Sequence, residues 1–312
     1  MVSSEESKVD AHAIDSMLEE YFPRQLSYGR DSLAAFEGVI NAQFNNGSLG
    51  QEFPKHFYGI PLMYNNDPFT ENSFTSSFIA GLAWCIGGFQ FYRQRLPTSE
   101  GRAAQIPSWS WARPKTLYPI ERGDLMLKFC IPHNWRLPDP IEVTVAHRVF
   151  GENKLDNIVA SPSPTDYLDF LPHIDITTYV LVPKVSNGKP LAEFWYVDSR
   201  SDHWSPSFLV DGSLPEVEGE QLALWLGLYM QPRDGFADAN EAYVETVTGI
   251  FLVCQENADK ETYSRVGLWF VPGFFYAEGH PLGFVEVLEK ISQHLKPDFG
   301  IQHLARRTIR LV

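Results

Sequence analysis

The chain has 312 residues, of which 44% are hydrophobic and 21% charged, and this composition excludes a disordered, collagen-like or coiled-coil protein. Its 39 acidic and 25 basic residues give a formal net charge of −14 at pH 7. Because such a chain repels a phosphate backbone, we expect no nucleic-acid partner. The basic residues near the end, Arg306, Arg307 and Arg310, are interpreted as an exposed strand edge.

The apolar stretches and the cysteines set expectations about location. The polar, acidic start carries no apolar signal core, and the longest apolar stretch, 78–89, is shorter than the roughly 20 residues that span a bilayer. The cysteines, Cys85, Cys130 and Cys254, are odd in number and far apart, so no closed set of disulfides is expected. The sequence predicts a cytoplasmic protein without a membrane partner, with buried structural thiols at Cys85 and Cys254.

The first hundred residues are predicted to be helical. Apolar residues recur at spacings of three and four over 13–22 and 31–44, and Asp31 is expected to cap the second of these helices. A third, largely buried helix is predicted over 72–86. We expect a helical region over 1–105.

After residue 105, short apolar runs separated by turn-forming residues predict strands. The predicted strands are 108–112, 125–130, 141–149, 179–185, 193–197, 207–210, 222–229, 247–254, 265–270 and 307–312. Residues 151–176 contain three prolines and are predicted to form an irregular connection, and one late helix is predicted over 283–295. The sequence thus predicts an α+β protein, in which an N-terminal helical cluster packs on a large antiparallel β-sandwich or barrel over 106–312 as one packed unit.

The sequence lacks the common motifs of catalytic and metal-binding sites. The glycine pairs lack the spacing of a phosphate loop, and the motifs G-x-S-x-G, H-E-x-x-H and C-x-x-C are all missing. We therefore predict no catalytic residue, no cofactor and no metal ligand.

Two other functional classes stay open. The stretch 197–204 (VDSRSDHW) brings carboxylates and an imidazole together, although a solvated turn is the simpler interpretation. Paired carboxylates beside Trp195, Trp204 and Trp225 would suit a glycosidase-like hydrolase. A β-barrel could instead bind a small molecule in an apolar cavity.

The most distinctive stretch is 106–112, Ile-Pro-Ser-Trp-Ser-Trp-Ala. Side chains alternate along a strand, so Trp109 and Trp111 are predicted to share one face and Ser108 and Ser110 the other. Because the stretch lies where helices give way to strands, we interpret the two indoles as a structural anchor between the helical part and the sheet. The alternative is a stacking wall for a ligand.

Several short motifs occur in an informative order along the chain. They are RQLS (24–27), DSLAAFEG (31–38), GIP (59–61), GLAW (81–84), PSWSWA (107–112), TGIFL (248–252) and YSRVG (263–267). This set resembles the region that follows the HET domain in fungal heterokaryon incompatibility proteins, and PSWSWA is its most specific member. The residues that carry the resemblance include Arg24, Asp31, Gly38, Pro107, Ser108, Trp109, Ser110, Trp111, Gly249, Arg265 and Gly267.

The resemblance implies a non-enzymatic scaffold or recognition module for self/non-self recognition. Its implied partner is a HET-domain protein, which it would restrain or present in cis or in trans; its ligand is unspecified. The HET effector domain itself has no counterpart in these 312 residues, so we expect either a truncated member or a stand-alone companion.

Physical reasoning gives the motif residues structural roles. Asp31 is expected to cap a helix, and Arg24 to pair with a carboxylate or with carbonyl groups near that cap. Gly38 interrupts a helix, which predicts close packing against it. Gly249 and Gly267 lie inside predicted strands, which predicts β-bulges or close backbone approach.

Overall fold

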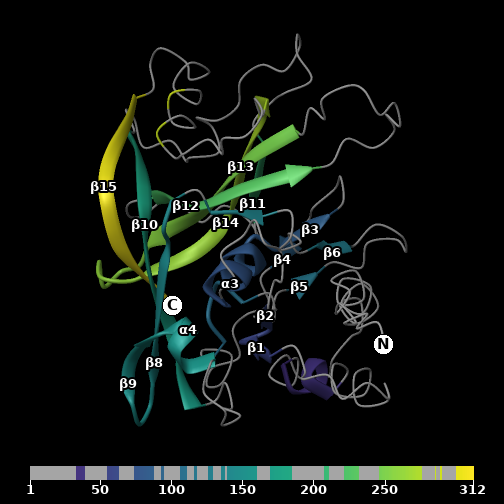
Figure 1. The fold of residues 1–312 in the computed structure, drawn as a ribbon, viewed down its shortest axis with the longest axis vertical. Helices are drawn as coiled ribbons and strands as arrows, with labels where there is room; N and C mark the ends of the chain where they lie inside the picture. The colour runs from purple at the N-terminus through teal and green to yellow at the C-terminus, as the bar shows by residue number, and fades with distance from the viewer. Residues whose placement is uncertain are drawn as a thin grey trace, which may run out of the picture.

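The computed structural model of the chain consists mostly of β-strands. It describes residues 33–38, 55–62, 74–87, 93–94, 106–110, 116–117, 126–128, 135–137, 139–159, 169–184, 207–210, 221–231, 246–275, 285, 289 and 300–312. Within these residues the molecule has a mixed sheet, in which five strands form a near-closed ring, and a few short helices (Figure 1).

Five long strands make the ring. They are β10 (Phe170–Lys184), β12 (Gln221–Gln231), β13 (Thr246–Glu256), β14 (Tyr263–Phe275) and β15 (Gly300–Leu311). Antiparallel pairing joins β10 to β12, β12 to β13, β13 to β14 and β15 to β10. The ring closes where β14 and β15 run parallel and pair at Tyr263 and Leu311. The sheet is therefore mixed, and the expectation of a purely antiparallel sheet is corrected at this closing pair.

Shorter elements surround the ring. Four strands join its sheet: β7 (Trp135–Arg136) pairs with β12, β8 (Glu142–His147) with β10, β9 (Gly151–Lys154) with β8, and β11 (Ser207–Val210) with β14. The separate strand pairs are β1 (Lys55–Phe57) with β2 (Ile60–Leu62), β3 (Cys85–Gly87) with β6 (Met126–Lys128), and β4 (Arg93–Gln94) with β5 (Thr116–Leu117). The helices are α3 (Phe74–Leu82) and the short α4 (Leu155–Val159), and residues 33–38 are also helical.

The strands β12, β13 and β14 are buried on both faces. Leu224, Leu252 and Leu268 occupy neighbouring register positions and belong to the main hydrophobic core. The residues next to them, Trp225, Phe251 and Trp269, point to the opposite face and form an aromatic row whose ring centroids lie 5.1 and 4.8 Å apart. All three rings have 0% exposure. Burial on both faces explains why these strands read as nearly continuous apolar runs in the sequence.

The main core joins residues from both halves of the chain. Phe36, Phe57, Phe78, Trp84 and Trp109 belong to the same buried cluster as the leucines and isoleucines of the ring strands. Helix α3 is buried along almost its whole length and lies beside the ring (Figure 1). Helix 33–38, the β1–β2 hairpin, α3 and Trp109 therefore share one core with the sheet.

Most of the strand predictions that fall on described residues are confirmed. The predicted strand 207–210 has the same bounds as β11, and the predicted strands 222–229, 247–254 and 265–270 lie inside the longer β12, β13 and β14. Helix α3 confirms the predicted helix 72–86 in part, because the chain enters β3 after Trp84. The predicted helix 13–22 and strand 193–197 lie outside the described residues.

The prediction of an irregular connection over 151–176 is wrong for the residues that are described, and 160–168 lie outside them. Residues 151–154 form β9, residues 155–159 form α4, and β10 already begins at Phe170. Pro172 was the misleading signal, because proline lacks the N–H that a strand needs. The structure accommodates it where the register between β10 and β8 shifts, between Phe170 and Ile174.

Candidate functional site

The distinctive motif segment 106–110 forms a turn, so the prediction of a strand there is wrong. The N–H of Ser110 donates a hydrogen bond to the carbonyl of Pro107 at 3.1 Å, which closes the turn. Ser108, Trp109 and Ser110 are all buried. Because the segment is not extended, the two serines do not share a face by alternation. Trp111 lies outside the described residues.

Trp109 lies inside the hydrophobic core, as expected of a structural anchor. Its indole stacks on Phe57 with centroids 5.7 Å apart and meets Tyr58 and Phe78 edge-on, each at 5.6 Å. Its carbonyl accepts a hydrogen bond from the indole N–H of Trp84 at 2.8 Å. Trp109 thus ties helix α3 and the β1–β2 hairpin together, and it has 0% exposure.

The two serines connect the turn to three other segments through main-chain groups. Ser110 Oγ donates to the carbonyl of Tyr58 at 2.6 Å, in the turn of the β1–β2 hairpin. Ser108 donates from both its N–H and its Oγ to the carbonyl of Val312, and its Oγ accepts from the N–H of Arg265 at 2.9 Å. The N–H of Val312 in turn donates to Tyr263 O at 3.0 Å. Ser108 is therefore hydrogen-bonded both to β14 and to the residue that follows β15, at the seam where these two strands close the ring.

Arg265 is a buried cation whose acceptors are backbone carbonyls. Its Nη1 donates to Leu82 O at 2.5 Å and its Nη2 to Trp84 O at 2.7 Å, at the C-terminal end of helix α3. The guanidinium carbon also lies 3.7 Å from the centroid of the Trp84 ring. A helix carries partial negative charge at this end, and an indole face attracts a cation. We call Trp84, Ser108, Trp109, Ser110 and Arg265 the central clip.

The two motif glycines lie at irregularities of the β13–β14 ladder, which confirms the prediction of bulges. The register shifts between Val247 and Gly249, and again where Val253 faces Gly267 while Cys254 faces Arg265. The second shift leaves one extra residue in β14 and interrupts the alternation of its side chains. In a regular strand, residues three positions apart point to opposite faces. The extra residue in β14 changes this, so Arg265 contacts Trp84 on the same core face as Leu268.

Three motif residues outside the clip have different outcomes. A Cβ built on Gly38 would meet no heavy atom within 4 Å, and the residue is exposed, so the prediction of close packing against Gly38 is wrong for the described part of the chain. The physical reason is that helix 33–38 turns this side to solvent while Leu33 and Phe36 face the core. Arg24 and Asp31 lie outside the described residues, and their roles stay predictions.

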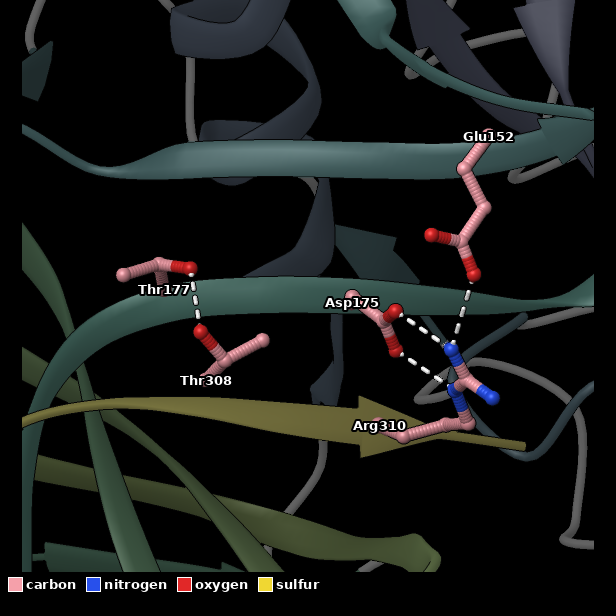
Figure 2. Close-up of polar contacts among 5 residues, drawn as sticks. All are labelled: Glu152, Asp175, Thr177, Thr308 and Arg310. Carbon is pink, nitrogen blue, oxygen red and sulfur yellow. Dashed lines mark hydrogen bonds and ion pairs between the residues drawn. The ribbon is translucent and has the colours of Figure 1, made fainter.

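The strands β9, β8, β10 and β15 carry a row of paired charges on their exposed face. Arg310 makes a two-pronged contact with Asp175, with both N···O distances at 2.7 Å, and reaches Glu152 at 3.2 Å (Figure 2). Glu142 lies 3.2 Å from both Lys154 and Arg306. Arg306 and Arg307 are exposed on β15, which pairs with β10 along one side and with β14 at Leu311. The interpretation of the three arginines as an exposed strand edge stays a prediction.

These contacts and local burial shift the pKa values of three side chains on or near the charged face. The hydrogen bond and charge of Lys154 lower the pKa of Glu142, and Arg306 adds to this effect. The hydrogen bond from Arg310 to Asp175 raises the pKa of Arg310. Burial, and then the charge of Arg310, lower the pKa of His173. Each described carboxylate in this row has a cationic partner, which is the arrangement of a structural ion-pair network and not of an acid–base pair.

The residues proposed for a hydrolase are only partly described. Trp225 has 0% exposure, so it does not line an open cleft. Trp195, Trp204 and the stretch 197–204 lie outside the described residues. Cys254 is a buried free thiol, as predicted, while nothing is described of the side chains of Cys85 and Cys130.

Neither a metal site nor a membrane span emerges from the described part of the chain. Its histidine, cysteine, aspartate and glutamate side chains nowhere gather in threes that could hold a metal ion. None of its helices has the length and apolar character needed to cross a bilayer.

We compared the chain with family models, curated proteins and solved structures, and nothing matches it in any of the three. The likeness to the HET-associated region therefore stays a prediction based on short motifs.

Proposed function

We propose that the chain is a non-enzymatic scaffold or recognition module of the kind that accompanies the HET effector domain in fungal heterokaryon incompatibility proteins. The supporting observation is the chemistry of the central clip. The Oγ atoms of Ser108 and Ser110 and the Nη1 and Nη2 atoms of Arg265 each contact main-chain groups of the protein itself. Buried side chains engaged in this way hold a framework together and are not available to a substrate. The most specific motif residues thus support an architectural role.

The proposal includes a finer architecture and a partner. An N-terminal helical cluster would cover the ring, extending the packing already seen for α3 and helix 33–38 against the core. The module would act in the cytoplasm by contacting a HET-domain protein, either in the same polypeptide or as a separate chain. Its rigid, doubly covered sheet suits a platform that presents or restrains another domain.

The alternatives receive less support from the described residues. A glycosidase needs tryptophans beside an open cleft, and Trp225 is buried. A ligand-binding barrel needs a cavity, and an eight-stranded barrel has an interior that side chains fill or that holds one small ligand. The five-strand ring is narrower, so a cavity within it is not favoured.

Turnover and binding assays on the purified chain test the proposal. We expect no turnover of NAD+, nitrophenyl glycosides or nitrophenyl esters, and a salt-resistant complex with a purified HET-domain protein in calorimetry. An unrelated protein of similar negative net charge is the control for nonspecific association. Turnover that follows the chain through two purification steps, or the failure of HET-domain proteins to bind, would contradict the proposal.

A further inference from the structure

Two hairpins are each closed by a histidine ring that accepts hydrogen bonds from the backbone. His147, the last residue of β8, accepts through Nδ1 from the N–H groups of Val149 and Phe150, at 3.1 and 3.2 Å. His56, in β1, accepts through Nδ1 from the N–H of Gly59 at 3.2 Å. In both hairpins the imidazole performs the task that an aspartate or asparagine side chain performs in an Asx turn.

The two histidine-closed hairpins meet on the same aromatic residue. The ring of His147 contacts Phe170 edge-on, with centroids 5.0 Å apart. Phe170 also contacts Phe57 at 5.2 Å, and its carbonyl accepts from the hydroxyl of Tyr58 at 3.1 Å. Because Phe57 and Tyr58 follow His56 directly, a change in either turn acts on the aromatic group around Trp109.

A proton on Nδ1 is incompatible with this geometry. Neutral imidazole has one acceptor nitrogen, whereas the imidazolium ion has N–H groups at both positions and accepts nothing. We propose that His147 and His56 form an acid-sensitive switch, in which protonation releases the turns of the β8–β9 and β1–β2 hairpins. This inference does not depend on the proposed function.

The switch would change what the β8–β9 hairpin presents to its surroundings. Val149 and Phe150 at its tip are large hydrophobic residues with 78% and 74% exposure. The ring of Phe150 lies 4.6 Å from that of His147, so the same imidazole that closes the turn also positions Phe150. Release of the turn therefore frees an exposed apolar side chain from its fixed orientation.

Four charged residues whose exposure is described lie near the two rings, and all four are exposed. Around His147 they are Arg148, Glu152 of β9 and Asp169, whose carbonyl accepts from the N–H of Arg148 at 2.7 Å. Glu37 lies on the helical turn whose Phe36 contacts His56, with ring centroids 5.8 Å apart, and Lys55 precedes His56 in the chain. The switch rests on the acceptor role of Nδ1 toward the backbone N–H groups and not on these charges.

Amide hydrogen exchange measured by NMR on the full chain tests the switch. Between about pH 7.5 and pH 5 we expect the protection factors of the Val149 and Phe150 amides to fall about tenfold. His147→Asn keeps an acceptor oxygen but cannot titrate, so it should abolish this fall. His56→Asn should do the same for the Gly59 amide. His173→Asn, on the charged face, is the matched control and should leave both responses unchanged.

Two results would overturn the proposal. One is acid-independent protection of these amides in the unmodified chain, and the other is an equal fall in His147→Asn. If the asparagine variants fail to fold, the ¹⁵N chemical shifts of the His147 and His56 rings in the unmodified chain replace them. The ring shifts must change over the same pH range as the protection of the Val149, Phe150 and Gly59 amides. Ring shifts that change with pH while the amide protection stays constant would also refute the switch.

Discussion

Arg265 shows how one buried side chain can join three parts of a fold. Its guanidinium contacts the last carbonyls of α3 and the face of Trp84, and its own N–H is held by Ser108. A planar, forked donor suits two carbonyls and an indole at once, whereas an ammonium group is a compact point charge. The identity of the cation should therefore matter as much as its charge.

We predict that Arg265→Lys lowers the free energy of unfolding by about 2 kcal/mol, because one carbonyl loses its charged donor and the indole loses its planar cation. Urea denaturation followed by circular dichroism measures this change. Arg307→Lys is the control at an exposed position and should shift the free energy by less than about 0.5 kcal/mol. Equal stability of the two variants would show that the Arg265 contacts contribute little.

Ser108 has a similar position at the seam of the ring. Ser108→Ala removes a donor to Val312 and leaves the buried N–H of Arg265 without its acceptor, so a loss of about 2 kcal/mol is expected in the same measurement. Ser264→Ala, which loses one half-buried bond to Asn257, is the control and should cost about 1 kcal/mol or less. A smaller effect at Ser108 than at Ser264 would argue against the role of Ser108 at the seam.

Among the elements, the charged face of β9, β8, β10 and β15 makes the stability of the folded protein depend on pH. The pKa of Glu142 is lowered in the folded protein, so the stability that it contributes is present above its unfolded pKa and is lost as pH falls through the folded value. We expect Glu142→Gln to be less stable than the unmodified chain at pH 7, by at most about 1 kcal/mol because both partners are largely exposed. The difference should begin to shrink near the ordinary glutamate pKa of about 4.3 and should vanish once the pH lies below the lowered pKa of folded Glu142.

Urea denaturation of both chains between pH 3 and pH 7 checks this prediction. Glu261→Gln is the control for removing an exposed charge, since Glu261 contributes its backbone N–H and not its carboxylate to the bond with Asp259. A stability difference for Glu142→Gln that grows as pH falls would contradict the assigned sign.

The elements also show where sequence reasoning succeeds and where it stops. Runs such as 222–229 were recognisable as strands because a leucine-rich segment buried on both faces leaves a continuous apolar signal. The β1–β2 hairpin was missed, because its turn places a tyrosine, Tyr58, at a φ of 48°, which no turn rule favours for that residue. The turn at 106–110 was mistaken for a strand, since tertiary contacts to Tyr58, Arg265 and Val312 set its shape.

The same limit applies to the central clip. The sequence singled out Ser108, Trp109, Ser110 and Arg265 through their motifs, and the bulges at Gly249 and Gly267 through glycines in strands. It could not show that Trp84 would belong to the clip or that Val312 would bond to it, because those contacts join residues up to 204 positions apart. Nor could it show the two histidine acceptors, since no residue pattern marks a ring nitrogen that receives backbone N–H groups.

For the whole molecule, the closure of the ring depends on the last residue described, Val312. A chain that ends at Leu311 loses the bonds from Ser108 and the bond to Tyr263, and we expect its free energy of unfolding to fall by roughly 3 kcal/mol. Val312→Ala keeps every main-chain group and should cost about 1 kcal/mol or less. Thermal or urea unfolding of the two variants compares them, and equal losses would mean that the side chain of Val312, not its backbone, secures the seam.

The parallel meeting of β14 and β15 has a consequence for biosynthesis. The pairs among β12, β13 and β14 join neighbours in the sequence and can assemble while the ribosome is still translating. The contact between Ser108 and residue 312 must wait until residue 312 has been translated and has left the exit tunnel. Until that moment the ring of five strands stays open at one side, and this is the stage at which a chaperone or a companion domain has access to it.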